Sequence, residues 1–124
     1  NAGLSPDGSS TYYMPRKIGD RRARELMLTN RVLSADEALD WGVVNQVVAD
    51  EDVLSTATKL ATKLAKGPTQ AFGQVKSLLD GSFDHSLETQ MELEARGIAA
   101  MIDTPDGQEG LHAFLQKRKP DFKG

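Results

Sequence analysis

Asp7 is the residue whose type and position most clearly indicate chemistry. It stands between Pro6 and Gly8, just before a segment of helical character, and the positive end of a helix stabilises a nearby carboxylate. A carboxylate presented there could act as a general acid or base, or as a nucleophile. The same position is also typical of an Asx turn or a helix cap. The residues around Asp7 leave both interpretations open.

The other residue types that carry chemistry give weaker signals. The backbone of residues 8–10 could bind an anion at the start of a helix, although the pattern favours ordinary turn and capping chemistry. His85 and His112 have no partner at ligand spacing, so we expect no metal site. There is no cysteine, which excludes disulfides and thiolate chemistry and fits a reducing, cytoplasmic compartment. We also find no P-loop, GxGxxG, HExxH or CxxC motif.

Composition and charge limit the classes of protein to which the chain can belong. The chain has 124 residues, of which 39% are hydrophobic and 27% are charged, so we expect one globular domain or less. No apolar run is long enough for a transmembrane helix, and no segment resembles a signal peptide. The net charge of −3 argues against nucleic-acid binding. Residues 16–31 and 117–124 are nevertheless basic, and they could either meet an anion such as phosphate or form solvated helix faces.

The spacing of apolar and capping residues predicts a mostly α-helical chain. Proline and glycine mark most of the expected boundaries. The predicted helices cover residues 9–14 (interrupted by Pro15), 20–30 (capped by Asp20), 34–42 (opened by a capping box of Ser34 and Glu37), 50–66 (capped by Asp50 or Asp52), 68–81, 84–102, and a last helix opened by Thr104 and Pro105.

One segment reads as a β-strand. Residues 43–48 have the sequence Val-Val-Asn-Gln-Val-Val and lie between Gly42 and an Ala-Asp pair, a composition typical of a strand. A single strand must pair with another to satisfy its backbone hydrogen bonds, and nothing else in the chain suggests a strand. We therefore expect the chain to be an incomplete fold.

Three stretches resemble the enoyl-CoA hydratase/isomerase (crotonase) family, in the family's order and spacing. Residues 3–19 resemble its pattern GLxPDxGGTxxLPRxxG. Residues 25–48 resemble the stretch ELxLTGxxxSAxEAxxxGLVxxVV, and residues 106–122 resemble the tail DxxEGxxAFxxKRxPxF. Together they cover nearly all of residues 3–124.

The resemblance implies the C-terminal helical part of the crotonase (ClpP/crotonase-like) fold with one short strand, and without the N-terminal ββα spiral. Residues 3–124 would be this helical portion, and Asn1 and Ala2 would be a remnant of cloning. In the family the spiral supplies two backbone N–H groups that form an oxyanion hole for a thioester enolate. We therefore expect the chain alone to be inactive.

The resemblance also implies an acyl-CoA substrate and a role for Asp7. Classical hydratases have glycine at this position. An acid there resembles the isomerases, in which it transfers a proton, or the 4-chlorobenzoyl-CoA dehalogenases, in which it attacks the ring. Ser9 and Ser10 replace the usual glycine pair, and the strings ELMLTNR and DWGVV favour the dehalogenase-like relatives slightly.

Phe114 and Lys117 match an aromatic residue and a lysine that, in the family, lie beside the CoA nucleotide in a neighbouring subunit's site. Phe114 could instead anchor the last helix in a core. The resemblance implies no cofactor beyond the coenzyme A of the substrate, a homo-oligomer of the trimer type, and no nucleic-acid or membrane partner. The alternative function is a non-catalytic helical oligomerisation module that self-associates.

Overall fold

The computed structural model describes residues 3–124. Asn1 and Ala2, which we assigned to a remnant of cloning, lie outside the described residues. The chain divides into two compact units, Asn1–Val53 and Leu54–Gly124, and each is considered by itself. Every regular element between residues 3 and 124 is helical, which confirms the mostly α class.

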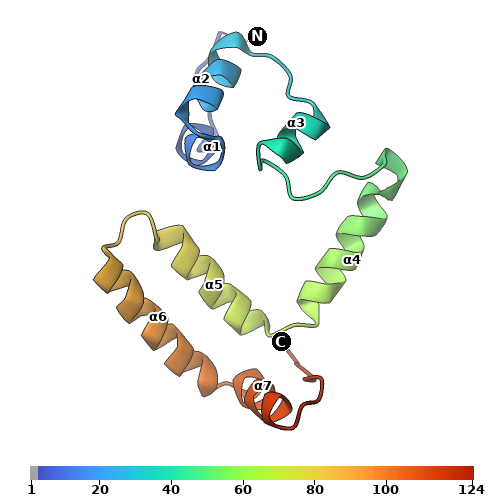
Figure 1. Cartoon of the computed structure of the whole chain (residues 1–124), viewed down its shortest axis with the longest axis vertical. Helices are drawn as coiled ribbons and strands as arrows, with labels where there is room; N and C mark the ends of the chain where they lie inside the picture. The colour runs from blue at the N-terminus through green and yellow to red at the C-terminus, as the bar shows by residue number, and fades with distance from the viewer. Residues whose placement is uncertain (1–2) are drawn as a thin grey trace. The chain divides into compact units, whose positions relative to one another are not determined.

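The first unit contains α1 (Ser10–Ile18), α2 (Asp20–Thr29), α3 (Ala35–Asp40) and the single 3₁₀ turn η1 (Asp50–Asp52). Helices α1 and α2 pack against each other (Figure 1). Ile18 and Ala23 are the buried apolar side chains of this pair.

Two predictions, one for α1 and one for α2, are wrong. Helix α1 continues through Pro15 to Ile18 instead of stopping there, although proline in a helix interior removes one backbone donor and crowds the carbonyl four residues earlier. The guanidinium of Arg16 donates to the carbonyl of Tyr12 at 2.9 Å. At the next helix, Gly19 occupies the N-cap with a φ of 83°. Asp20 is therefore not the cap; it lies in the first turn and pairs with Arg24 at 2.7 Å.

The start and end of α3 agree with the prediction. Ser34 accepts the N–H of Glu37 at 3.2 Å, and Glu37 accepts the N–H of Ser34 at 3.3 Å, which confirms the capping box. Gly42 follows the helix with a φ of 73°. Arg31 ties α3 to α2 through Glu25 at 2.6 Å and Glu37 at 3.2 Å. The N–H of Ser34, followed by Arg31, lowers the pKa of Glu37.

The strand predicted over residues 43–48 is not formed. The N–H groups of Val43 and Val44 point back to the carbonyl of Ala38, at 2.8 and 3.2 Å. Within residues 3–124 no second extended segment pairs with it, and β-branched residues become a strand only when a neighbour satisfies their backbone groups.

The second unit contains α4 (Val53–Ala65), α5 (Thr69–Gly81), α6 (Leu87–Ile102) and α7 (Pro105–Leu115). Helices α5 and α6 lie side by side, and α7 turns away from the end of α6 (Figure 1). Helix α6 begins later than predicted, because the hydroxyl of Ser86 caps it by accepting the N–H of Thr89 at 3.2 Å. Thr104 caps α7 as predicted, with Pro105 in the first turn. Helix α4 follows η1, which begins at Asp50.

Little apolar surface is buried inside the described part of either unit. Its buried hydrophobic side chains are Ile18, Ala23 and Ala113. The helix faces predicted from periodicity are present but open to solvent, including Val53, Leu60 and Leu64 along α4. Contiguous exposed apolar surface of this kind is typical of interfaces.

Candidate functional site

Asp7 presents an exposed carboxylate just before α1. Its main-chain carbonyl accepts the N–H of Ser10 at 3.0 Å and the Ser10 hydroxyl at 2.7 Å. The carboxylate itself makes no hydrogen bond or ion pair to any of residues 3–124. Asp7 therefore forms neither the Asx turn nor the helix cap that its position also allowed, and its carboxylate oxygens are available to a ligand.

The backbone between Asp7 and α1 has an unusual conformation. Gly8 and Ser9 have φ values of 58° and 60°, and Ser9 makes no side-chain capping bond to α1. Left-handed backbone is costly at a residue that carries a Cβ, about 1–2 kcal/mol. This double left-handed turn sets Asp7 beside the positive end of α1, where negative charge is favoured.

A hollow of about 590 Å³ lies in the first unit, and Asp7 itself is not among its lining residues. Its lining includes Pro6 and Ser10, the residues that flank the Asp7 turn, together with Met14 and Met27 of the two packed helices. The lining is polar over nearly half of its surface, with Ser5, Ser10 and Asn30 beside the apolar side chains. The free carboxylate and this hollow together are the candidate reaction site of the first unit.

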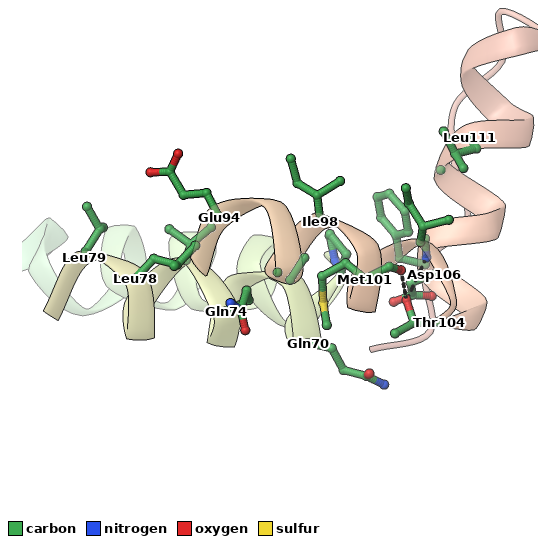
Figure 2. Close-up of a pocket in the computed structure, with 18 of the residues that line it drawn as sticks. Gln70, Gln74, Leu78, Leu79, Glu94, Ile98, Met101, Thr104, Asp106 and Leu111 are labelled. Atoms are coloured by element: carbon green, nitrogen blue, oxygen red, sulfur yellow. Dashed lines mark hydrogen bonds between the residues drawn. The ribbon is translucent and has the colours of Figure 1, made fainter. Parts of the chain in front are cut away.

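A second hollow, of about 670 Å³, lies in the second unit between α5, α6 and α7 (Figure 2). Gln70, Gln74 and Leu78 line it from α5, and Ile98 and Met101 line it from α6. Its walls are almost wholly apolar. We consider it a packing surface, because its buried carboxylate, that of Asp106, is already engaged.

The two oxygens of Asp106 accept main-chain N–H groups from the end of the chain. Oδ1 accepts from Lys123 at 2.8 Å and Oδ2 accepts from Gly124 at 3.0 Å. Figure 2 shows Asp106 at the junction of α6 and α7, beside Thr104 and Met101. Asp106 is not among the residues that were predicted to carry chemistry.

Glu109 binds the same tail three residues further along α7. Its oxygens pair with both terminal nitrogens of Arg118, at 2.6 and 2.8 Å, and Oε1 also accepts the N–H of Asp121 at 2.8 Å. Asp106 and Glu109 are spaced i, i+3, which places them on one helix face, and a basic tail follows them. This pattern could have predicted that the tail contacts Asp106 and Glu109. We call Asp106, Glu109 and Arg118 the tail clamp.

Phe114 and Lys117 lie at the end of α7, just before the clamped tail. Within residues 3–124, Phe114 is 81% exposed, and the buried apolar side chain of α7 is its neighbour Ala113, at 1%. Lys117 has a φ of 53°. Its N–H donates to the carbonyl of Phe114 at 3.1 Å, and that of Arg118 to the carbonyl of Ala113 at 3.0 Å, which together form a Schellman motif.

Glycine is the residue normally favoured at the left-handed position of a Schellman motif. Lysine at position 117 costs about 1–2 kcal/mol there, and its ammonium group has no partner among residues 3–124. A side chain kept at such a backbone position is a candidate for function. The structure places Lys117 and Phe114 at one helix end in the second unit, whereas Asp7 belongs to the first unit.

Acid should release the part of the tail that Glu109 holds. The guanidinium of Arg118, followed by the N–H of Asp121, lowers the pKa of Glu109 from 4.5 to about 2. Because a lowered pKa means that the ionised form stabilises the fold, this contribution is complete above pH 4.5. It is lost as the pH falls towards 2. We expect carboxyl ¹³C shifts to give a midpoint near 2 for Glu109, with the Asp121 amide signal moving in parallel.

The matched control is Glu109→Gln, in which the acid-induced movement of the Asp121 amide should disappear. A Glu109 midpoint at its ordinary value, with the tail amides in their native positions, would contradict the expectation.

Residues 3–124 contain neither a metal-binding cluster nor a membrane-spanning helix. No group of three or more His, Asp or Glu side chains in that range could hold a metal ion. None of the helices there has the length and hydropathy needed to cross a bilayer.

Comparison with known proteins gives concordant results. The model of the family "Enoyl-CoA hydratase/isomerase" matches residues 1–124. The chain is 41% identical, over 93% of its length, to 4-chlorobenzoyl coenzyme A dehalogenase-1 of an Arthrobacter species, and covers 42% of that protein. It is 40% identical, over 98% of its length, to 1,2-epoxyphenylacetyl-CoA isomerase of Escherichia coli K12, of which it covers 47%.

A solved structure shows the same fold. The enoyl-CoA hydratase/isomerase of Cupriavidus metallidurans CH34 is 35% identical and superposes with a TM-score of 0.89, over 98% of this chain and 46% of that one. The chain thus spans less than half the length of the relatives it matches. A helical architecture, the three sequence stretches and these similarities agree, and the chain belongs to the enoyl-CoA hydratase/isomerase (crotonase) family.

Proposed function

We propose that the protein carrying this chain is an acyl-CoA enzyme of the hydratase/isomerase type, in which Asp7 acts as the acid/base on a thioester enolate. The observation that carries the proposal is the exposed carboxylate of Asp7, which is unpaired among residues 3–124 and belongs to the turn whose flanking residues, Pro6 and Ser10, line the hollow at the start of α1. The family membership supports an acyl-CoA substrate.

Both roles of Asp7 in this reaction depend mainly on where its carboxylate lies relative to the substrate. As a base, the carboxylate removes a proton from a carbon that is made acidic by conjugation with the thioester, and an enolate forms. As an acid, it returns the same proton to a different carbon, so the product is an isomer. By the family resemblance, the N–H groups that stabilise the enolate oxygen come from the ββα spiral.

A second candidate is a dehalogenase, and the 41% identity to 4-chlorobenzoyl coenzyme A dehalogenase-1 favours it. Asp7 would then attack the ring carbon that carries chlorine. Chloride leaves, an aryl ester of Asp7 forms, and water hydrolyses this ester to release a hydroxybenzoyl thioester. The exposure of Asp7 suits either role, since both need a carboxylate with free oxygens.

Substrate assays on the full-length protein distinguish the two candidates. An isomerase converts an enoyl-CoA or epoxyacyl-CoA without release of chloride, whereas a dehalogenase releases one chloride for each 4-chlorobenzoyl-CoA. Absence of turnover with every acyl-CoA thioester would contradict both.

We also propose that Phe114 and Lys117 bind the nucleotide of coenzyme A, in a neighbouring subunit's site. An exposed aromatic ring can stack on adenine, and a lysine supplies a point charge for phosphate. Coenzyme A would enter as part of the substrate, and no other cofactor is proposed. The cytoplasm remains the proposed compartment.

Residues 1–124 produced alone should show no turnover of crotonyl-CoA, because the proposed oxyanion donors are not among them. The alternative, in which this chain by itself is a non-catalytic oligomerisation module, also predicts that residues 1–124 are inactive, and it is compatible with an active full-length protein. Spectrophotometric assay of both proteins measures these expectations: turnover by the full-length protein and none by residues 1–124. Turnover by residues 1–124 alone would show that the spiral is not needed.

The same short chain should self-associate. Large apolar side chains are exposed along its helices and loops, with Val32 at 90% and Leu28 at 82%, and surfaces of this kind associate in water. Light scattering at micromolar concentration should give a mass above 13.5 kDa. A sharp monomer would contradict this prediction.

A further inference from the structure

The end of the chain is held to α7 at several separate points. The side chain of Arg118 and the N–H of Asp121 bind Glu109. The N–H groups of Lys123 and Gly124 bind Asp106. The tail therefore follows one path along the helix from which it has just emerged, and both anchoring carboxylates belong to that helix.

The ring of Phe122 also lies against α7. A Cβ at Gly110 would be in ordinary van der Waals contact with the ring, 3.5 Å from Cε1 of Phe122, which places the ring beside the helix. At the end of the tail, a Cβ at Gly124 would be 3.4 Å from Oγ1 of Thr69, which shows that the tail reaches the start of α5. Figure 1 shows the C-terminus near the start of α5.

Lys117 is the residue between the helix and the first anchor. On its N-terminal side the Schellman bonds hold its backbone, and on its C-terminal side Arg118 is fixed by Glu109. Its left-handed conformation is thus held from both sides. Its ammonium group, in contrast, has no partner among residues 3–124, and Phe114 one turn earlier is exposed.

Two carboxylates and an arginine are thus engaged in holding backbone, while the adjacent cation and aromatic ring are left open. The clamp has a further electrostatic consequence. Glu109 is occupied by Arg118, the side chain next to Lys117, and so Lys117 is not drawn to Glu109.

We propose that Asp106, Glu109 and Arg118 are positioning residues, which fix the backbone from which Lys117 and Phe114 bind the phosphate and adenine groups of coenzyme A. This inference rests on the nucleotide contact given under the proposed function. The clamp touches no substrate atom. Its effect is to order Lys117 before binding, so that less conformational freedom is lost when the nucleotide binds.

Two substrates separate this role from a merely structural one. The acyl-CoA thioester carries the nucleotide, whereas the corresponding acyl-pantetheine thioester has the same reacting group without it. In the full-length enzyme, Glu109→Gln should raise KM for the CoA thioester about threefold to tenfold and leave kcat unchanged. KM for the pantetheine thioester should stay the same.

The matched control is Glu92→Gln, which removes a carboxylate from an exposed pair with Arg96 on α6 and should leave both KM values unchanged. Arg118→Lys is the milder second variant, because it keeps the charge and loses the two-pronged contact. It should reproduce the KM effect in a protein with wild-type circular dichroism.

Lys117→Ala distinguishes failure of the inference from failure of the proposed nucleotide contact. If Lys117→Ala raises KM for the CoA thioester alone, and adding Glu109→Gln to it has no further effect, the positioning role is supported. The positioning role is overturned if Lys117→Ala raises KM for the CoA thioester but Glu109→Gln and Arg118→Lys do not. It is also overturned if Glu109→Gln and Arg118→Lys raise KM equally for the CoA and the pantetheine thioester. If Lys117→Ala leaves KM for the CoA thioester unchanged, the proposed nucleotide contact is wrong, and the inference that rests on it is wrong too.

Discussion

Asp7→Asn should lower kcat of the full-length enzyme by about 10²–10⁴-fold, the usual contribution of a positioned acid or base. The amide has nearly the shape of the carboxylate but cannot take up the proton or attack a ring carbon. Coenzyme A binding should be almost unchanged, because the proposed nucleotide contacts belong to the second unit. Initial rates and calorimetric titration with coenzyme A measure the two quantities.

Asp84→Asn is the matched control for this prediction. Asp84 is also an exposed loop carboxylate next to a helix, so it reproduces the loss of charge without the position beside the hollow. It should retain wild-type turnover. Wild-type turnover in Asp7→Asn would remove Asp7 from the mechanism, whichever reaction the enzyme catalyses.

Gly107→Ala should destabilise the second unit by about 1–3 kcal/mol or more, the range expected for overpacking at a close contact. A Cβ at this position would overlap the carbonyl oxygen of Met101 and lie 2.9 Å from its carbonyl carbon. That neighbour is main chain, which cannot rotate away as a side chain can. The Gly107 N–H also binds the Thr104 cap at 3.0 Å, so any shift would disturb the turn between α6 and α7.

Gly73→Ala provides the opposite control in the same unit. It lies inside α5, and a Cβ there would meet nothing within 4 Å. Alanine should therefore stabilise the helix by about 0.5–1 kcal/mol. Urea unfolding followed by circular dichroism measures both variants, and equal free energies of unfolding for the two would show that the close contact at Gly107 is not maintained in solution.

The site could be predicted only in part. Asp7 and the pair Phe114 and Lys117 were identified from residue types and family resemblance, but the availability of the Asp7 carboxylate depends on backbone geometry. The left-handed turn at Gly8 and Ser9 determines this availability. Because of the turn, the main-chain carbonyl of Asp7 binds Ser10, and the Asp7 side chain does not. The exposure of Phe114 likewise depends on which face of α7 is buried.

Features that depend on neighbours in sequence were determined by the sequence itself. The capping box of Ser34 and Glu37 and the cap at Thr104 join residues three apart, so their hydrogen bonds follow from local geometry. Family membership is likewise readable from ordered motifs. Even here, propensity was overridden at Pro15, which α1 accommodates within its length.

Tertiary structure decided the features that depend on distant partners. Residues 43–48 have strand composition, yet they form no strand because none of residues 3–124 pairs with them. The tail clamp joins Asp106 to Gly124, eighteen residues apart, and no local rule specifies such a contact. The physical reason is the same in both cases: a hydrogen bond between distant residues forms only when the fold brings donor and acceptor together.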